Sequence, residues 1–135
     1  MSDIILSKSE ENLDVANFLH TESFFCSSVH CSYYSSYQLM LYVLYEYFND
    51  SEEDYCETNE VNNAGSHNHL INLIRNEIRK INKDSIRDFD NNIRDLKELR
   101  KNADYKQIKI IPKDSRDAIV KTEKIRGIIK KTFSI

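Results

Sequence analysis

Two cysteines and a histidine, Cys26, His30 and Cys31, lie close together in the chain, and thiols and imidazoles are common metal ligands. A zinc site needs four ligands in a structural role or three protein ligands in a catalytic one. The remaining histidines and cysteines are His20, Cys56, His67 and His69. No recognised metal-ligand spacing connects these four residues with Cys26, His30 and Cys31. The pattern favours small buried thiols beside a hydrogen-bonded histidine, and we expect neither a metal nor another cofactor.

Tyrosines are dense in one stretch, at Tyr33, Tyr34, Tyr37, Tyr42, Tyr45 and Tyr47. Aromatic side chains can stack on nucleic-acid bases, but such platforms are usually exposed and flanked by cations. Residues 27–48 contain no Lys or Arg, so the pattern favours packing in a core or a dimer interface. The serines of this stretch lack nearby His and Asp partners, and the only glycines, Gly65 and Gly127, form no phosphate-binding loop.

The two parts of the chain carry opposite charge. Residues 1–74 hold one basic and twelve acidic side chains, a net charge of −11, whereas residues 75–135 hold eighteen basic and ten acidic, a net charge of +8. This asymmetry suits a nucleic-acid surface, and it equally suits complementary faces within one fold or across a dimer. Charge runs on helices usually form the solvated side. The candidate binding residues are Arg87, Arg94, Lys97, Lys101, Lys124, Lys130 and Lys131.

Length and composition indicate which kind of secondary structure holds these residues in place. A chain of 135 residues with 40% hydrophobic and 30% charged residues suits one globular domain, 1–135. Two glycines and one proline are too few for the frequent turns of a β-sandwich or barrel, which leaves long helices. The longest apolar run, residues 39–45, is far shorter than a membrane span, and no signal-peptide pattern precedes residue 7. We therefore expect a cytoplasmic protein with reduced cysteines and no membrane segment.

Apolar residues recur at helical spacing in five stretches of the chain. The capping box Ser7-Lys8-Ser9-Glu10 predicts where the first helix starts, and Asp114 or Ser115 is expected to cap the last. In the second of these stretches, apolar residues line more than one side of the expected helix, which predicts that this helix is central and buried on more than one side. The expected helices span residues 7–20, 27–48, 70–81, 86–103 and 114–133.

An acidic segment rich in Asn, Ser and Glu, residues 49–68, separates the second helix from the third and is expected to be an exposed loop. His67 and His69 lie near its end, which favours a loop or capping position for both. A shorter extended link precedes Pro112. Together these elements predict an all-α fold, a five-helix, up-and-down bundle with a long acidic loop between helices 2 and 3.

Two short motifs resemble those of the HEPN family of small helical proteins. Ser32-Tyr33-Tyr34-Ser35 is similar to its Tyr-Tyr element flanked by small residues, and Leu99-Arg100-Lys101-Asn102-Ala103-Asp104-Tyr105 is similar to its Leu-Arg-x-x-Ala-Asp-Tyr segment. The resemblance covers roughly residues 7–133. It implies a HEPN-like bundle that forms a homodimer and works beside a minimal nucleotidyltransferase in toxin–antitoxin or defence systems. Many members are metal-independent ribonucleases with an Arg-x4-6-His motif.

This chain departs from that ribonuclease motif, because its last histidine, His69, precedes its first arginine, Arg75. At the corresponding place Arg100 is followed by Asp104 and Tyr105. A histidine, with a pKa near 6.5, exchanges protons well at neutral pH. A tyrosine, or a carboxylate beside a guanidinium, suits that task poorly. Arg100 and Asp104 are also an i,i+4 pair, which is a common structural clamp on a helix.

Two functions from different classes follow from the resemblance. The favoured one is an interaction module without ribonuclease chemistry, which binds RNA, a nucleotide, or a protein such as a nucleotidyltransferase-type antitoxin through its basic C-terminal half. The alternative is a metal-independent ribonuclease toxin with a variant site built from Arg100, Asp104 and Tyr105. The missing Arg-x4-6-His motif favours the first and argues against an enzyme.

Overall fold

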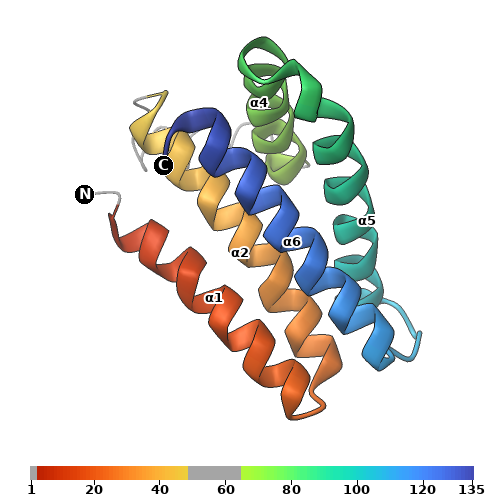
Figure 1. The fold of residues 1–135 in the computed structure, drawn as a ribbon. Helices are drawn as coiled ribbons and strands as arrows, with labels where there is room; N and C mark the ends of the chain where they lie inside the picture. The colour runs from red at the N-terminus through yellow and green to blue at the C-terminus, as the bar shows by residue number, and fades with distance from the viewer. Residues whose placement is uncertain (1–2, 49–64) are drawn as a thin grey trace.

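The computed structural model describes residues 3–48 and 65–135, and within these ranges the chain is helical and contains no strand (Figure 1). The described α-helices are α1 (Asp3–Thr21), α2 (Phe25–Glu46), α4 (Ser66–Ile81), α5 (Ile86–Tyr105) and α6 (Pro112–Phe133). A single 3-10 turn, η1 (Lys83–Ser85), joins α4 to α5. The predicted all-α fold with five helices is confirmed. No described helix is both long and apolar enough to cross a membrane.

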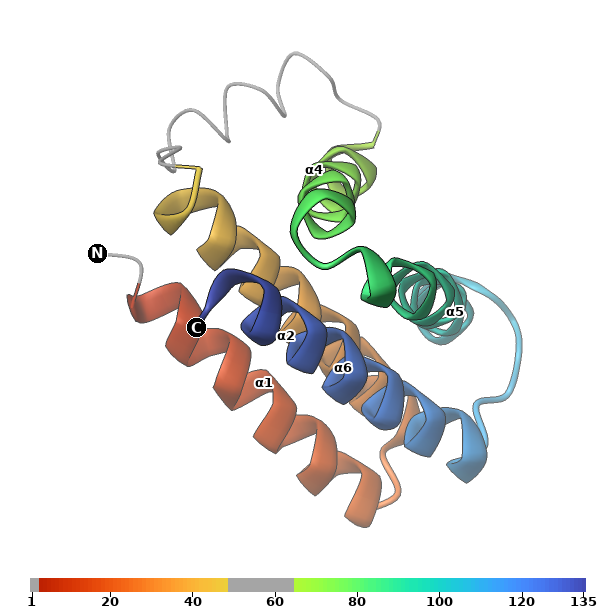
Figure 2. The same ribbon diagram turned by 45° about the horizontal axis from the view of Figure 1, so that its top comes forward.

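Helix α2 lies at the centre of the bundle, and α1, α4, α5 and α6 all pack against it. Its apolar residues point to several sides, so each neighbouring helix covers a different part of its surface. Figures 1 and 2 show α1 at one edge of the molecule and α4 and α5 at the opposite edge. Fully buried core residues include Val29, Leu39, Met40, Ile74, Phe89, Leu96, Ile125 and Ile129.

Helix α1 is joined to α2 largely by hydrogen bonds between short side chains and backbone. Only Ser9 and Ala16 of α1 are fully buried. The Ser9 hydroxyl donates to the Ser35 carbonyl at 2.6 Å, and the Ser35 hydroxyl donates back to the Ser9 carbonyl at 2.8 Å. The Ser28 hydroxyl donates to the Ala16 carbonyl at 2.7 Å. Because these bonds satisfy buried hydroxyl groups, the seam between α1 and α2 is polar yet costs little desolvation.

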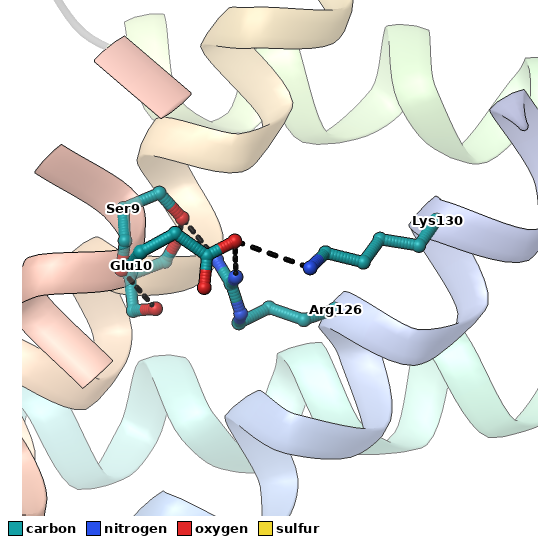
Figure 3. A network of polar contacts seen from close by, with 5 residues as sticks. Ser9, Glu10, Arg126 and Lys130 are labelled. Carbon is teal, nitrogen blue, oxygen red and sulfur yellow. Dashed lines mark hydrogen bonds and ion pairs between the residues drawn. The ribbon is translucent and has the colours of Figure 1, made fainter. Parts of the chain in front are cut away.

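An ion network fastens α1 to α6 (Figure 3). Arg126 is 3% exposed, and its Nη2 lies 2.8 Å from Oε1 of Glu10, which also accepts a hydrogen bond from Nζ of Lys130 at 3.1 Å. Nη1 of Arg126 donates to the Ser9 hydroxyl. Burial alone would raise the pKa of Glu10, but the Lys130 ammonium and the Arg126 guanidinium bring it below its ordinary value of 4.5. Glu10 is therefore ionised at neutral pH, as a buried guanidinium requires of its partner.

The predicted starts of α1 and α6 are wrong. Helix α1 begins at Asp3, so Ser7 lies inside the helix and the predicted capping box does not cap it. The apolar residues before Ser7 continue the helical pattern, and the Ser9 hydroxyl bonds to α2 instead. Helix α6 begins at Pro112, a residue favoured at the first helical position by its fixed φ and missing N–H. Asp114 still supports this start, because its carboxylate accepts the N–H of Ile111 at 3.0 Å.

The predicted acidic loop ends earlier than expected. Residues 66–68 belong to α4, and residues 49–64 lie outside the described residues. Gly65 has a φ of 112°, a left-handed value that favours glycine, and it turns the chain into α4. His67 and His69 are therefore helical residues rather than loop residues.

Candidate functional site

Helices α2, α4 and α5 meet at a group of aromatic and charged side chains, which we call the Arg100 cluster. Its members are His30, Tyr33, Tyr34 and Tyr37 of α2, His67 of α4, and Arg100, Asp104 and Tyr105 of α5. Residues three or four apart share one helix face, which explains why α2 and α5 each contribute several members. The cluster thus brings together all the sequence-predicted catalytic candidates and both tyrosines of the Tyr-Tyr motif.

Arg100 is 8% exposed and is surrounded by aromatic rings. Its Cζ lies 4.7 Å from the ring centroid of Tyr33, 5.9 Å from that of Tyr34 and 5.5 Å from that of Tyr105. Nη1 donates to the Tyr105 hydroxyl at 3.2 Å, and Nε is buried without a hydrogen-bond partner among the described residues. Ring faces attract a guanidinium, so these contacts offset part of the cost of burying its charge.

Asp104 forms the predicted clamp with Arg100, but its shorter contact is to His30. Nη1 of Arg100 lies 3.8 Å from Oδ2 of Asp104, whereas Nδ1 of His30 lies 2.9 Å from the same oxygen and 3.1 Å from Oδ1. The His30 side chain is 47% exposed, and the Asp104 side chain is 18% exposed. Asp104 therefore orients a surface imidazole in addition to neutralising Arg100, an arrangement that fixes which nitrogen of His30 carries the proton.

His67 is the second histidine of the cluster, and the prediction of an exposed loop or capping role for it is wrong. Nδ1 of His67 lies 2.8 Å from the Tyr33 hydroxyl, and the imidazole stacks on Tyr37 with ring centroids 4.1 Å apart. Burial lowers the pKa of the His67 imidazole below its ordinary value of 6.5, and the charges of Arg100 and Lys97 lower it further. His67 is therefore neutral at pH 7 and able to accept a proton.

Helix periodicity was the one sequence signal that could have found His67. It precedes Leu70, Ile71 and Ile74 by three, four and seven residues, and those three side chains are buried. A residue at that spacing falls on the buried face of the same helix. The predicted helix begins at Leu70 instead, because histidine is not an apolar residue.

The thiols near His30 have no metal-binding arrangement. Cys26 is exposed, contrary to the expectation of a buried thiol, and Cys31 is half-buried. Burial raises the pKa of the Cys31 thiol, and the Asp104 carboxylate raises it further, so Cys31 is not a thiolate nucleophile at neutral pH. Within the described ranges, no three His, Cys, Asp or Glu side chains are grouped so that they could hold a metal ion.

Four of the predicted binding residues form a row beside the cluster, which we call the basic stripe of α5. These residues are Arg87, Arg94, Lys97 and Lys101. Their spacings of seven, three and four residues place them on one side of the helix. Lys97 is half-buried, and its ammonium donates to Oδ1 of Asn68 in α4. Burial lowers the pKa of Lys97, and the charges of Lys101 and Arg100 lower it further.

The other predicted binding residues lie on α6, outside the Arg100 cluster. Lys124 and Lys131 line one groove between α5 and α6. Lys130 faces α1 and pairs with Glu10, as described above. The structure therefore brings Lys124 and Lys131 together and separates Lys130 from them.

A scan of protein-family models, a search of curated proteins and a search of solved structures give no match to this chain. Chemically, the Arg100 cluster combines ring faces that can stack on bases with two imidazoles that can move protons, and the basic stripe of α5 beside it supplies cations that can bind phosphates.

Proposed function

We propose that this chain is a HEPN-like interaction module that binds RNA at the Arg100 cluster and along the basic stripe of α5. One observation carries the proposal: the tyrosines of α2, which have no cation in their own helix, receive cations from α5. Arg100 lies over Tyr33 and Tyr34, with Lys97 and Lys101 on the adjoining turns. Aromatic rings flanked by cations are the arrangement that binds single-stranded nucleic acid.

Accessibility within the cluster supports the same function. Tyr105 is 75% exposed and Tyr34 is half-buried, so both rings can be reached by a base. The Tyr34 hydroxyl is protonated at neutral pH and can donate a hydrogen bond to a phosphate or base. Buried Arg100 contacts the faces of these two rings and holds them in place, while the lysines of the basic stripe of α5 bind the phosphates.

The test is fluorescence anisotropy with a labelled single-stranded RNA at low and high salt. The double variant Lys97→Gln/Lys101→Gln should weaken binding at low salt by about tenfold or more and reduce the salt slope by about 1.4, because about two phosphate contacts are lost. Its matched control is Lys124→Gln/Lys131→Gln, which removes the same charge from the groove on α6 and should leave binding within about twofold. Equal losses in both variants would show that only net charge matters.

A second candidate function, metal-independent RNA cleavage, is favoured by the two histidines beside one tyrosine ring. Centroids of the His30 and His67 rings lie 4.7 Å and 6.0 Å from that of Tyr34. In this reaction a ribose 2′-hydroxyl attacks the adjacent phosphorus while a base takes its proton. The P–O5′ bond breaks as an acid protonates the leaving oxygen, giving a cyclic phosphate and a 5′-hydroxyl. Neutral His67 suits the base, and His30 held by Asp104 suits the acid.

Cleavage is tested by incubating RNA with the purified protein in excess chelator. If the histidines act as proposed, His67→Asn and His30→Asn should each reduce cleavage by a factor of about 100 or more, while the control His69→Asn should not. Binding without cleavage would leave the interaction module as the function. Cleavage that survives both substitutions would exclude these histidines.

The homodimer and the nucleotidyltransferase-type antitoxin in the proposal follow from the HEPN resemblance, and the cytoplasmic location follows from the sequence composition. The breadth of the apolar surface of α2 would also suit a dimer interface. Four helices of the same chain cover that surface. A dimer would therefore be formed by other faces of the molecule.

A further inference from the structure

The outward face of α1 carries large apolar side chains that no described residue covers. Ile4 is 69% exposed, Val15 is 37% exposed and Phe18 is 62% exposed, and Phe24, just after the helix, is 59% exposed. The spacings of eleven and three residues from Ile4 to Val15 to Phe18 place these three side chains on one side of the helix. That side is opposite the one that packs against α2 and α6.

Carboxylates surround these apolar residues. The exposed acidic residues of α1 and its end are Asp3, Glu10, Glu11, Asp14 and Glu22, against a single exposed cation, Lys8. Glu10 pairs with α6, but none of the other four has an ion-pair partner among the described residues. We call this combination of exposed apolar and acidic residues the α1 face. It is an apolar stripe with an unneutralised acidic rim.

The α1 face is held rigidly from behind. The reciprocal bonds of Ser9 with Ser35 and the pairing of Glu10 with buried Arg126 fix the helix on the bundle (Figure 3). Preorganised surfaces bind with less loss of conformational entropy. Figures 1 and 2 place α1 at the opposite edge of the molecule from α4 and α5, so a partner here would not compete with RNA at the Arg100 cluster.

We propose that the α1 face binds a basic amphipathic helix of a partner protein, with apolar residues on its contact side and Lys or Arg beside them. The acidic rim selects this occupant, because complementary charge fixes register and rejects partners of like charge. A second copy pairing through α1 would place two acidic rims against each other, and RNA or an anionic membrane would be repelled.

The probe is a synthetic helical peptide of Leu and Lys, with Leu on one face, compared with the same peptide carrying Glu in place of Lys. Binding to the full chain is followed by fluorescence anisotropy. The Lys peptide should bind at least about tenfold more tightly than the Glu peptide. Phe18→Ser should weaken binding of the Lys peptide by about tenfold, and so should the charge variant Glu11→Gln/Asp14→Asn.

The matched control is Val120→Ser, which removes an exposed apolar side chain from α6, where Val120 is 44% exposed. It should leave peptide binding unchanged, and all variants should keep the thermal midpoint of the wild type because they alter exposed residues. Equal binding of both peptides, or equal loss in Phe18→Ser and Val120→Ser, would overturn the proposal.

Self-association of the wild type that Phe18→Ser abolishes would overturn the proposal in favour of a second copy of this chain. RNA binding should be the same in Phe18→Ser as in the wild type, so failure here is distinct from failure of the proposed function.

Discussion

Arg100 shows how a charged side chain in this fold depends on a few specific partners. Its guanidinium is nearly buried, its only carboxylate partner among the described residues is Asp104, and ring faces supply the other contacts. Removing one member of such a pair leaves a charge without compensation, which costs more than the pair itself contributes. The side chain therefore links the stability of the bundle to the geometry of the candidate site.

Asp104→Asn should accordingly lower the free energy of unfolding by about 1–3 kcal/mol, because it leaves Arg100 without a carboxylate. Urea denaturation measures this change. Lys80→Ala is the control, since its Lys80–Glu77 pair is on the surface and its ammonium side chain is 73% exposed. An unchanged free energy of unfolding in Asp104→Asn, together with a loss of RNA cleavage, would show that Asp104 acts in chemistry rather than in stability.

His67 makes stability depend on pH within a defined window. Because its pKa is lowered in the folded state, the unfolded chain binds a proton more readily, so stability is complete above about pH 6.5 and falls as the pH drops below that value. His67→Gln should remove this decrease in the free energy of unfolding between pH 6.5 and about pH 4.5. Below about pH 4.5, protonation of Glu10 also lowers stability. Urea denaturation across this range tests the prediction, with exposed His69→Gln as the control. A fall that persists in His67→Gln would assign it to other groups.

At the scale of the helix, α1 is held by the ion network of Glu10 with Arg126 in addition to its packing on α2. Glu10→Gln removes the carboxylate that neutralises Arg126, so the seam should open more often. Hydrogen exchange of the α1 amides should become faster, while exchange in α4 and α5 should be unchanged. The neighbouring substitution Glu11→Gln removes an exposed charge that has no ion-pair partner among the described residues, and it serves as the control. Faster exchange in Glu11→Gln to the same degree would mean that overall charge, not the ion network, holds α1.

The helices themselves could be predicted from the sequence, because apolar spacing reports which face of each helix is buried. Val29, Tyr33, Met40 and Leu44 lie on the predicted stripe of α2 and are buried. Contacts between helices could not be predicted in this way. Their partners are far apart in the chain, as His30 is from Asp104.

For the candidate site, too, the sequence identifies residues that share a motif but not residues that only tertiary packing brings together. Arg100, Asp104 and Tyr105 were found because they share one short motif. His67 was missed because its role depends on α4 packing beside Tyr33 and Tyr37. The Arg-x4-6-His motif concerns spacing along the chain, so its absence does not exclude histidines that other helices bring into the same cluster.

Across the whole molecule, the charge asymmetry of the sequence becomes a spatial one. Acidic α1 lies at one edge and the basic stripe of α5 lies at the other (Figure 1). Opposite edges of opposite charge suit two different partners more than one. Both proposed binding surfaces, the α1 face and the basic stripe of α5, therefore follow from the charge asymmetry of the sequence.

The homodimer is also a property of the whole molecule. Light scattering after gel filtration should give twice the mass of one chain at concentrations of about 10 μM or more, if the HEPN resemblance extends to assembly. Phe18→Ser should give the same mass, because the α1 face is assigned to a different partner. A monomer mass at that concentration would remove the dimer from the proposal.

The central claim is that RNA binds at the Arg100 cluster, and the imidazole signals of the four histidines test it most directly by NMR. His30 and His67 lie in the cluster, whereas His20 lies 2.8 Å from buried Ser115 at the junction of α1 and α6. Single His→Gln variants assign the signals. Titration with a short single-stranded RNA should shift the signals of His30 and His67 in proportion to binding and leave His20 unmoved. Binding that shifts neither His30 nor His67, or that shifts His20 most, would contradict the account.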